Sequence, residues 1–96
     1  MEGIYEIIFQ EAVLKIDVPK ISRAWRVKII HSIDGKLRIH PEIFGKPLRY
    51  SLKNHRVLRV GDYRVVFRID GSAVVVILIE HRSVVYELIK KRIQTK

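Results

Sequence analysis

The chain has 96 residues, no cysteine and a formal net charge of +9 at pH 7, from 19 lysines and arginines against 10 acidic residues. This length fits one compact domain, because a second hydrophobic core needs a longer chain. The lack of cysteine excludes disulfides and thiolate metal sites, and the four histidines are scattered rather than grouped at metal-ligand spacing. We therefore expect a single domain over residues 1–96 with no metal and no cofactor.

The excess of basic residues predicts an anionic partner, because such a field attracts polyanions and accelerates their capture. A basic surface that only keeps the protein in solution is the alternative, and the positions of the charges decide between the two. The sequence does not begin with a basic stretch before an apolar run, and no uncharged segment is long enough to cross a bilayer. We therefore expect a cytoplasmic protein with no membrane partner.

The N-terminal half predicts a strand followed by two helices. β-Branched and aromatic residues in 4–9 favour a first strand, and residues 11–16 are typical of a short helix. Pro19 suits the first turn of a new helix, so the second helix is expected to start there. Apolar residues then recur every three or four positions, which predicts an amphipathic helix that packs on a sheet and ends near Gly35.

The C-terminal half predicts a sheet. Two prolines and a glycine in 36–50 indicate a connecting loop, with one short helical turn in it. Three runs rich in β-branched residues follow, at 57–60, 63–69 and 73–79. The pairs Gly61-Asp62 and Asp70-Gly71 separate them and are favoured in tight hairpin turns, so the runs predict a three-stranded antiparallel meander.

A closing helix is expected after Ser83, which suits its N-cap, and basic residues crowd its last turns. Lys90 and Lys91 there either complement the negative end of the helix dipole or contact RNA. The order of elements predicts an α+β fold with an N-terminal strand, a helical hairpin, a three-stranded antiparallel meander and a C-terminal helix.

The two hairpin turns also fix which residues face one another across the strands. If Asp70-Gly71 closes the second turn, Phe67 faces Val74 and Tyr63 faces Leu78, so these side chains belong to one apolar face. We expect that face to form the core.

The opposite face brings two arginines together. Arg59 lies directly opposite Arg64 across the first turn, and like charges in that position destabilise a sheet by roughly several tenths of a kcal/mol. A bound phosphate would compensate for this repulsion. An internal ion pair with Asp62 or Glu80 is the alternative.

Three further side chains are expected near this arginine pair. His81 and Arg82 leave the end of the last strand, and Tyr86 lies one helical turn beyond. Guanidinium groups grip phosphate oxygens, imidazole can move a proton near neutral pH, and a tyrosine ring can stack on a base. Together these residue types predict an RNA site that requires no metal.

Segments 46–48, 58–67, 79–82 and 85–86 resemble the RelE/ParE toxin superfamily. The resemblance spans nearly the whole chain, and the order of elements agrees with the family's β-α-α-β-β-β-α plan. It implies a toxin of a type II toxin–antitoxin pair, neutralised in a hetero-oligomer by an acidic cognate antitoxin. Members of the RelE branch enter the ribosomal A site and cut messenger RNA. The ribose 2′-hydroxyl attacks the adjacent phosphate and leaves a cyclic phosphate.

The resemblance implies roles for Arg59, Arg64, Arg82 and Tyr86, and the chemistry of imidazole adds a role for His81. Arg59 and Arg64 are assigned to the phosphate, Arg82 to the phosphate or leaving group, His81 to proton transfer and Tyr86 to base stacking or orientation. Further RNA contacts are expected from basic residues on neighbouring elements: Lys53, His55, Arg68, Lys90 and Lys91.

The chain also departs from the family pattern. Some ribosome-dependent members carry two lysines on the strand that enters the motif, where this chain has His55 and Val57. The general base is therefore left between His55 and Lys53. Two alternatives stay open beside a metal-independent endoribonuclease: a ParE-like inhibitor of DNA gyrase, and a catalytically silent member that only binds its antitoxin.

Overall fold

The computed structural model describes residues 4–48 and 54–94 and has the expected α+β fold. Its sheet is five-stranded, with the strand order β1-β5-β4-β3-β2. The strands are β1 (Glu6–Phe9), β2 (Lys46–Pro47), β3 (His55–Val60), β4 (Tyr63–Asp70) and β5 (Ala73–His81). β1 runs parallel to β5, and every other neighbouring pair is antiparallel.

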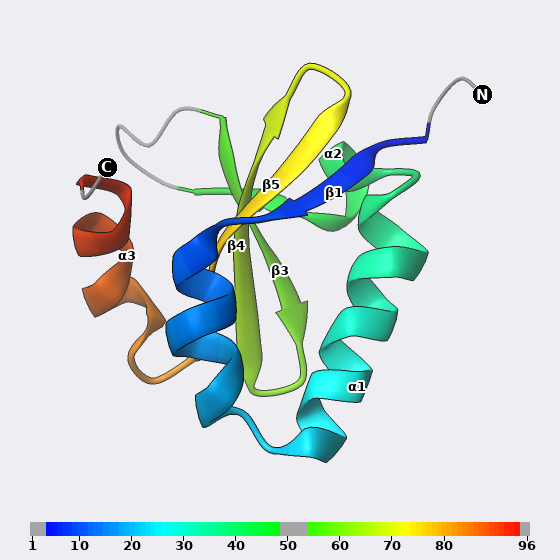
Figure 1. Ribbon diagram of the computed structural model, residues 1–96. Helices are drawn as coiled ribbons and strands as arrows, with labels where there is room; N and C mark the ends of the chain where they lie inside the picture. The colour runs from blue at the N-terminus through cyan, green and yellow to red at the C-terminus, as the bar shows by residue number, and fades with distance from the viewer. Residues whose placement is uncertain (1–3, 49–53, 95–96) are drawn as a thin grey trace.

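Helices lie on both sides of this sheet (Figure 1). The helical elements are a first segment at 11–20 that contains η1 (Val13–Asp17) and η2 (Val18–Lys20), then α1 (Arg23–Ser32), η3 (Ile33–Leu37), α2 (Pro41–Phe44) and α3 (Val85–Gln94). The first segment and α1 form the expected helical hairpin on one face, and α3 packs on the other.

Both boundaries of the second helix differ from the prediction. α1 begins later because the side chain of Ser22 caps it, accepting a hydrogen bond from Trp25 N at 3.4 Å. Pro19 lies instead in η2, at the end of a first helical segment that is longer than expected. At the other end, Gly35 does not adopt a left-handed φ, and helical turns continue to Leu37, whose burial holds them on the core.

The loop expected at 36–50 contains α2, which confirms the short helical turn, and also β2, which was not expected. β2 pairs with β3, with Lys46 opposite Val57 and Pro47 opposite Arg56. A two-residue strand that contains proline carries almost no periodic signal in the sequence, because the two-residue alternation needs a longer run to be visible.

The three-stranded meander is confirmed, but the register of its second hairpin was wrong. The turn consists of Gly71 and Ser72, because Gly71 has a φ of +60° and takes the first turn position, where positive φ is favoured. Phe67 therefore faces Val76 rather than Val74. A β-bulge between Val66 and Phe67 shifts the register again.

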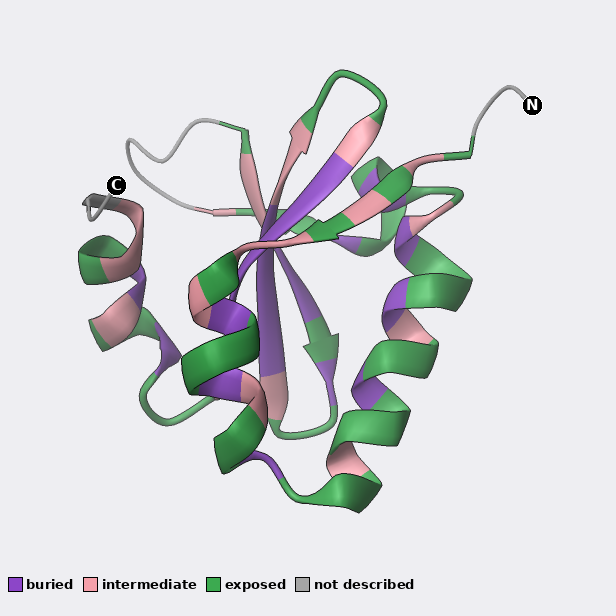
Figure 2. Ribbon diagram, in the orientation of Figure 1, coloured by how far each residue is buried: buried purple, intermediate pink, exposed green. Residues whose placement is uncertain are grey.

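This bulge changes which residues reach the core. Leu78, expected on the core face, packs instead with the residues under α3, and Ile79 packs in the cluster under α1. Both faces of β4 and β5 are buried in their central part, because helices cover both sides of the sheet (Figure 2). Burial on both faces also explains why 73–79 is a nearly continuous apolar run rather than an alternating one.

Beyond the end of β1, an ion pair makes the hydrogen bonds to the backbone of β5 that a strand would otherwise make. Gln10 N makes the last main-chain contact on this edge of β5, to Val76 O at 3.0 Å. Beyond it, Ile79 N donates to Asp17 Oδ2 at 3.0 Å, and Arg92 Nη1 donates to Ile77 O at 2.9 Å. Arg92 and Asp17 also bind each other through two hydrogen bonds of 2.9 Å. This pair therefore links the first helical segment, β5 and α3.

Candidate functional site

Arg59 and Arg64 face each other on β3 and β4, as the sequence predicted. Glu80 of β5 pairs with Arg64 and extends the same row of side chains across the sheet. This row lies on the sheet face that packs against α3, which we call the arginine face. It is next to the buried row of Val57 and Val66 and nearer the turn between β3 and β4. α3 covers the apolar middle of this face, so the site occupies its end.

Arg64 is held rigidly although its side chain carries a charge. Only 7% of the residue is exposed, and Nη1 donates to Gly61 O and to Tyr63 O at 2.9 Å each. In the described part of the chain no buried side-chain nitrogen lacks a hydrogen-bond partner, so the other guanidinium nitrogens of Arg64 still reach solvent. Arg64 therefore stabilises the turn and keeps donors for an anion.

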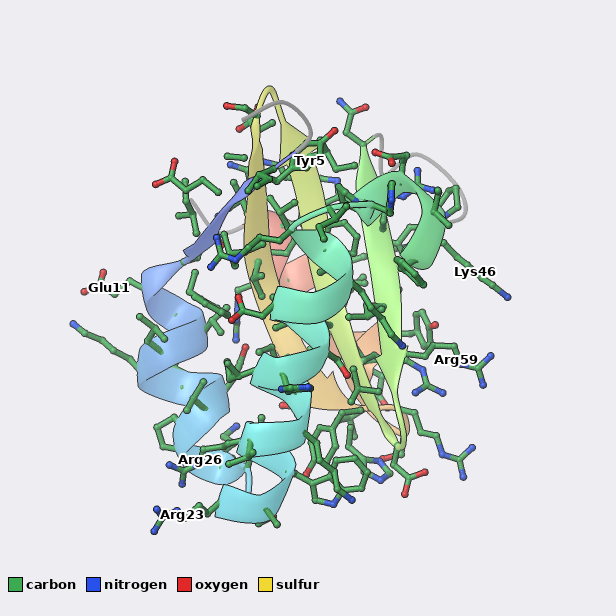
Figure 3. The ribbon with its side chains drawn as sticks, turned by 90° about the vertical axis from the view of Figure 1, so that its right-hand side faces the viewer. Tyr5, Glu11, Arg23, Arg26, Lys46 and Arg59 are labelled. Atoms are coloured by element: carbon green, nitrogen blue, oxygen red, sulfur yellow. The ribbon has the colours of Figure 1, made fainter. Side chains whose placement is uncertain are left out.

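Arg59 is exposed and points away from α1 (Figure 3). Asp62 and Glu80 are the carboxylates that could neutralise the arginine pair. Within the described part of the chain, neither forms an ion pair with Arg59 or Arg64. Asp62 contacts Arg82, with Nε and Oδ1 3.5 Å apart, and Glu80 accepts the backbone N–H of His81 at 3.1 Å. The internal ion pair is thus not formed, and the repulsion between the arginines is left for an external anion to relieve.

Arg82 is brought to the same turn by its backbone. Its N–H donates to Asp62 O at 2.8 Å, which places the first residue after β5 beside the turn between β3 and β4. Its side chain is largely exposed even with the contact to Asp62. The side chain of Arg64 and the backbone N–H of Arg82 therefore donate to adjacent carbonyls of one turn, those of Gly61 and Asp62.

His81 does not join the arginine pair. It pairs with Tyr63, so its side chain lies on the α1 face, where the two rings meet edge to face with centroids 5.7 Å apart. Tyr63 in turn packs against Trp25 of α1 at 5.2 Å. The expectation that His81 reaches the site assumed unbroken alternation along β5. The bulge between Val66 and Phe67 reverses the two faces beyond it, so Glu80 joins the arginine pair and His81 faces α1.

Ser83 also holds the ring of His81 in place. Its Nδ1 accepts the backbone N–H of Ser83 at 3.1 Å and lies 2.9 Å from the Ser83 hydroxyl. A nitrogen that accepts a main-chain N–H carries no proton of its own, so the neutral ring is protonated on Nε2. Ser83 was wrongly expected to cap α3, because its hydroxyl contacts this ring and the helix begins only at Val85.

The remaining predicted residues lie on α3 and at the far end of β3 and β4. Tyr86 is in the first turn of α3 and is 59% exposed, so its ring is accessible for stacking. Lys90 and Lys91 are exposed on later turns of the same helix. His55 faces Arg68 on the α3 side, beyond the buried row of Val57 and Val66. Arg68 contacts Asp70 at 3.4 Å.

Lys53 lies outside the described residues. In residues 4–48 and 54–94, no group of three or more histidine or acidic side chains is arranged to hold a metal ion. No helix within those ranges is long and apolar enough to cross a membrane.

The sequence prediction gave Lys46 no role beyond its place in a segment that resembles the family. In β2 it pairs with Val57 and thereby lies on the same sheet face as Arg59. The two side chains point to the same side of the molecule (Figure 3). The adjacent proline was the available signal, since proline in a sheet is typical of an edge strand.

Comparison with known proteins places this geometry among bacterial toxins. Residues 27–86 match the family described as ParE toxin of type II toxin-antitoxin system, parDE. Toxin RelE of Mycobacterium tuberculosis is 34% identical over 74 residues, which are 75% of this chain and 76% of that protein. Toxin RelG of the same organism is 32% identical over 72 residues, 73% of this chain and 83% of that protein.

A solved structure supports the same grouping. A chain in the crystal structure of the toxin–antitoxin complex RelBE2 from Mycobacterium tuberculosis is similar with a TM-score of 0.77 and 28% sequence identity. The match covers 86% of this chain and 97% of that chain. The fold is therefore shared over almost the full length of the solved protein.

Proposed function

Since the chain belongs to the RelE/ParE superfamily of toxins from type II toxin–antitoxin systems, we propose that it blocks translation by cutting messenger RNA at the ribosome. The observation that carries the proposal is the facing pair of Arg59 and Arg64, which no carboxylate in the described part of the chain neutralises. Two relatives named RelE and RelG favour this activity over inhibition of DNA gyrase.

The chemistry requires stabilisation of charge more than covalent participation of the protein. The ribose 2′-oxygen attacks the adjacent phosphorus, the bond from phosphorus to the 5′-oxygen breaks, and the products carry a 2′,3′-cyclic phosphate and a 5′-hydroxyl. Negative charge grows on the phosphoryl oxygens during this step, and preorganised donors lower its energy. Arg64 is suited to that role because two carbonyls already fix its guanidinium, so little reorganisation is needed.

The other residues take supporting roles in the proposed site. Arg59 neutralises the same phosphate from β3, and Arg82 binds the phosphate or the leaving 5′-oxygen from the neighbouring turn. Tyr86 stacks on a base with its exposed ring. Neither histidine lies beside the arginine pair: His81 packs against Tyr63 on the other face, and His55 lies beyond the buried row of Val57 and Val66, four residues along β3 from Arg59. The general base is therefore not assigned to either.

We further infer an acidic antitoxin as the partner that neutralises this toxin. The support is the net charge of +9 and the similarity to a chain solved in a toxin–antitoxin complex. Association of two oppositely charged proteins is accelerated by electrostatic attraction and weakened by salt. The ribosome and its message are the target partners in this proposal.

The test is inducible expression of the wild type, Arg59→Ala and Arg23→Ala in a bacterial host, with incorporation of labelled methionine and thymidine followed in parallel. Arg23 is an exposed arginine of α1 on the opposite side of the sheet, so it controls for loss of one positive charge. We expect the wild type and Arg23→Ala to stop methionine incorporation first, with cleaved message detected by primer extension, and Arg59→Ala to stop neither.

Two other outcomes would contradict the proposal, and each would indicate a different function. Early loss of thymidine incorporation, with intact message, would indicate the gyrase inhibitor that the ParE description of the matching family favours. Normal incorporation of both labels with the wild type would indicate a silent family member that only binds its antitoxin.

A further inference from the structure

Lys46 provides a cation on the arginine face that the proposed cleavage site does not use. β2 places it opposite Val57, and paired residues of neighbouring strands point to the same face of a sheet. Val57 and Arg59 are two residues apart on β3 and so share that face as well. Lys46 is therefore the diagonal cross-strand neighbour of Arg59, and Figure 3 shows both side chains projecting away from α1.

The charge of Lys46 is not neutralised within the described part of the chain. The side chain is exposed and makes no ion pair or hydrogen bond there. Glu42, the nearest carboxylate in sequence, is engaged elsewhere: it accepts from Tyr5 Oη at 3.4 Å and lies 3.9 Å from His40 Nδ1. Among the described residues, Arg59 and Lys46 are thus two adjacent cations that both lack a counter-charge.

We propose that Lys46, beside Arg59, forms a second phosphate subsite, which binds the RNA phosphodiester next to the one held by Arg59, Arg64 and Arg82. The inference rests on the proposed function and defines the path of the substrate. Diagonal neighbours on one sheet face are about 7–8 Å apart, a separation comparable to that of consecutive phosphates in an extended single strand. The RNA backbone would then cross the sheet from β4 over β3 to β2.

The composition of this surface favours a nucleic acid over a protein segment. Protein interfaces draw most of their binding energy from buried aromatic or aliphatic anchors. Here the residue between the two cations, Val57, is itself buried and offers no such anchor. Contacts with phosphate need only the cations, and they position a nucleic acid strand without reading its sequence.

The inference is tested by binding rather than by cleavage. The probe is a fluorescently labelled single-stranded RNA with 2′-O-methyl riboses, which cannot be cut because the attacking oxygen is blocked. Affinity is measured by anisotropy over a range of salt concentrations for the wild type, Lys46→Gln, Lys46→Arg and Lys20→Gln. Lys20 is an exposed lysine of η2, so its variant matches the charge change at a site on the other side of the sheet.

We expect Lys46→Gln to bind several-fold more weakly and to lose about 0.7 from the slope of log affinity against log salt, the value for one phosphate contact in a single strand. Lys46→Arg should bind like the wild type, and so should Lys20→Gln. Unfolding midpoints within about 1 °C of wild type would exclude misfolding as the cause, since only the main chain of residue 46 pairs with β3.

Three results would separate an RNA subsite at Lys46 from a general effect of charge, from an acidic protein partner, and from the proposed cleavage. Equal effects of Lys46→Gln and Lys20→Gln would overturn the subsite. Weakened binding of Lys46→Gln to polyglutamate, with RNA binding unchanged, would overturn it in favour of an acidic protein. If Lys46→Gln loses RNA affinity as expected while the wild type leaves ribosome-bound message intact, the subsite stands and the proposed cleavage fails.

Discussion

Replacing Asp17 with asparagine is expected to destabilise the fold strongly, although Asp17 is remote from the arginine site. Its side chain is 1% exposed and accepts three hydrogen bonds, two from Arg92 and one from the backbone N–H of Ile79. An amide at this position has one acceptor oxygen and no charge. The guanidinium of Arg92, whose side chain is only 15% exposed, would then lose both a hydrogen bond and its counter-charge.

The magnitude follows from the burial of the pair. Removing one partner of a buried ion pair destabilises a protein by about 3–5 kcal/mol, and the lower limit applies here because Arg92 retains some solvent. A domain of this size loses about 4–8 °C of melting temperature per kcal/mol. Asp17→Asn should therefore lower the melting temperature by about 12–24 °C, a large part of a total stability of about 5–15 kcal/mol.

The assay is urea and thermal unfolding followed by circular dichroism, in an Arg59→Ala background so that the protein can be produced without its proposed toxicity. Asp34→Asn is the matched control, because Asp34 binds Arg38 at 3.0 Å on an exposed surface. Its effect should stay below about 1 kcal/mol. Adding Arg92→Met to Asp17→Asn should recover part of the loss, because the unpaired charge is then gone.

An effect of Asp17→Asn no larger than that of Asp34→Asn would refute the reasoning. It would mean that Arg92 can be hydrated without its partner at little cost in the free energy of unfolding, and that the ion pair does not hold α3 to β5. Full recovery by the double variant would instead indicate that the stability comes from packing, with the ion pair adding only the penalty of leaving one partner alone.

The remaining predictions concern the turn between β3 and β4 and its surroundings. Gly61→Ala should destabilise by more than about 2 kcal/mol in urea, because φ is +58° and the added Cβ would collide with the ring of Trp25. Gly35→Ala should stabilise by about 0.4–1 kcal/mol, since φ is not positive there and nothing lies within 4 Å of the new Cβ. Arg59→Ala should raise the free energy of unfolding in urea by roughly several tenths of a kcal/mol, because it removes the repulsion with Arg64. Arg64→Ala should lower stability by about 1–3 kcal/mol, as two turn carbonyls lose their donor.

The sequence by itself determined the features that depend on neighbouring residues. Arg59 and Arg64 are only five positions apart, and the two-residue turn at Gly61 fixes their pairing whatever the rest of the chain does. The strands of the meander and the amphipathic α1 were likewise visible in local periodicity. The resemblance to the RelE/ParE superfamily was read from the same local motifs, and the comparisons confirmed it.

Tertiary structure decided the features that depend on register or on distant contacts. A single bulge at Val66 reverses which side chains of β5 face the core, so His81 was expected in the site and lies on the other side of the sheet. Asp17 and Arg92 are 75 positions apart, and nothing local marks them as partners. Lys46 gains its place beside Arg59 only because β3 accepts β2 as an edge strand, and side-chain periodicity cannot reveal pairing across such a distance.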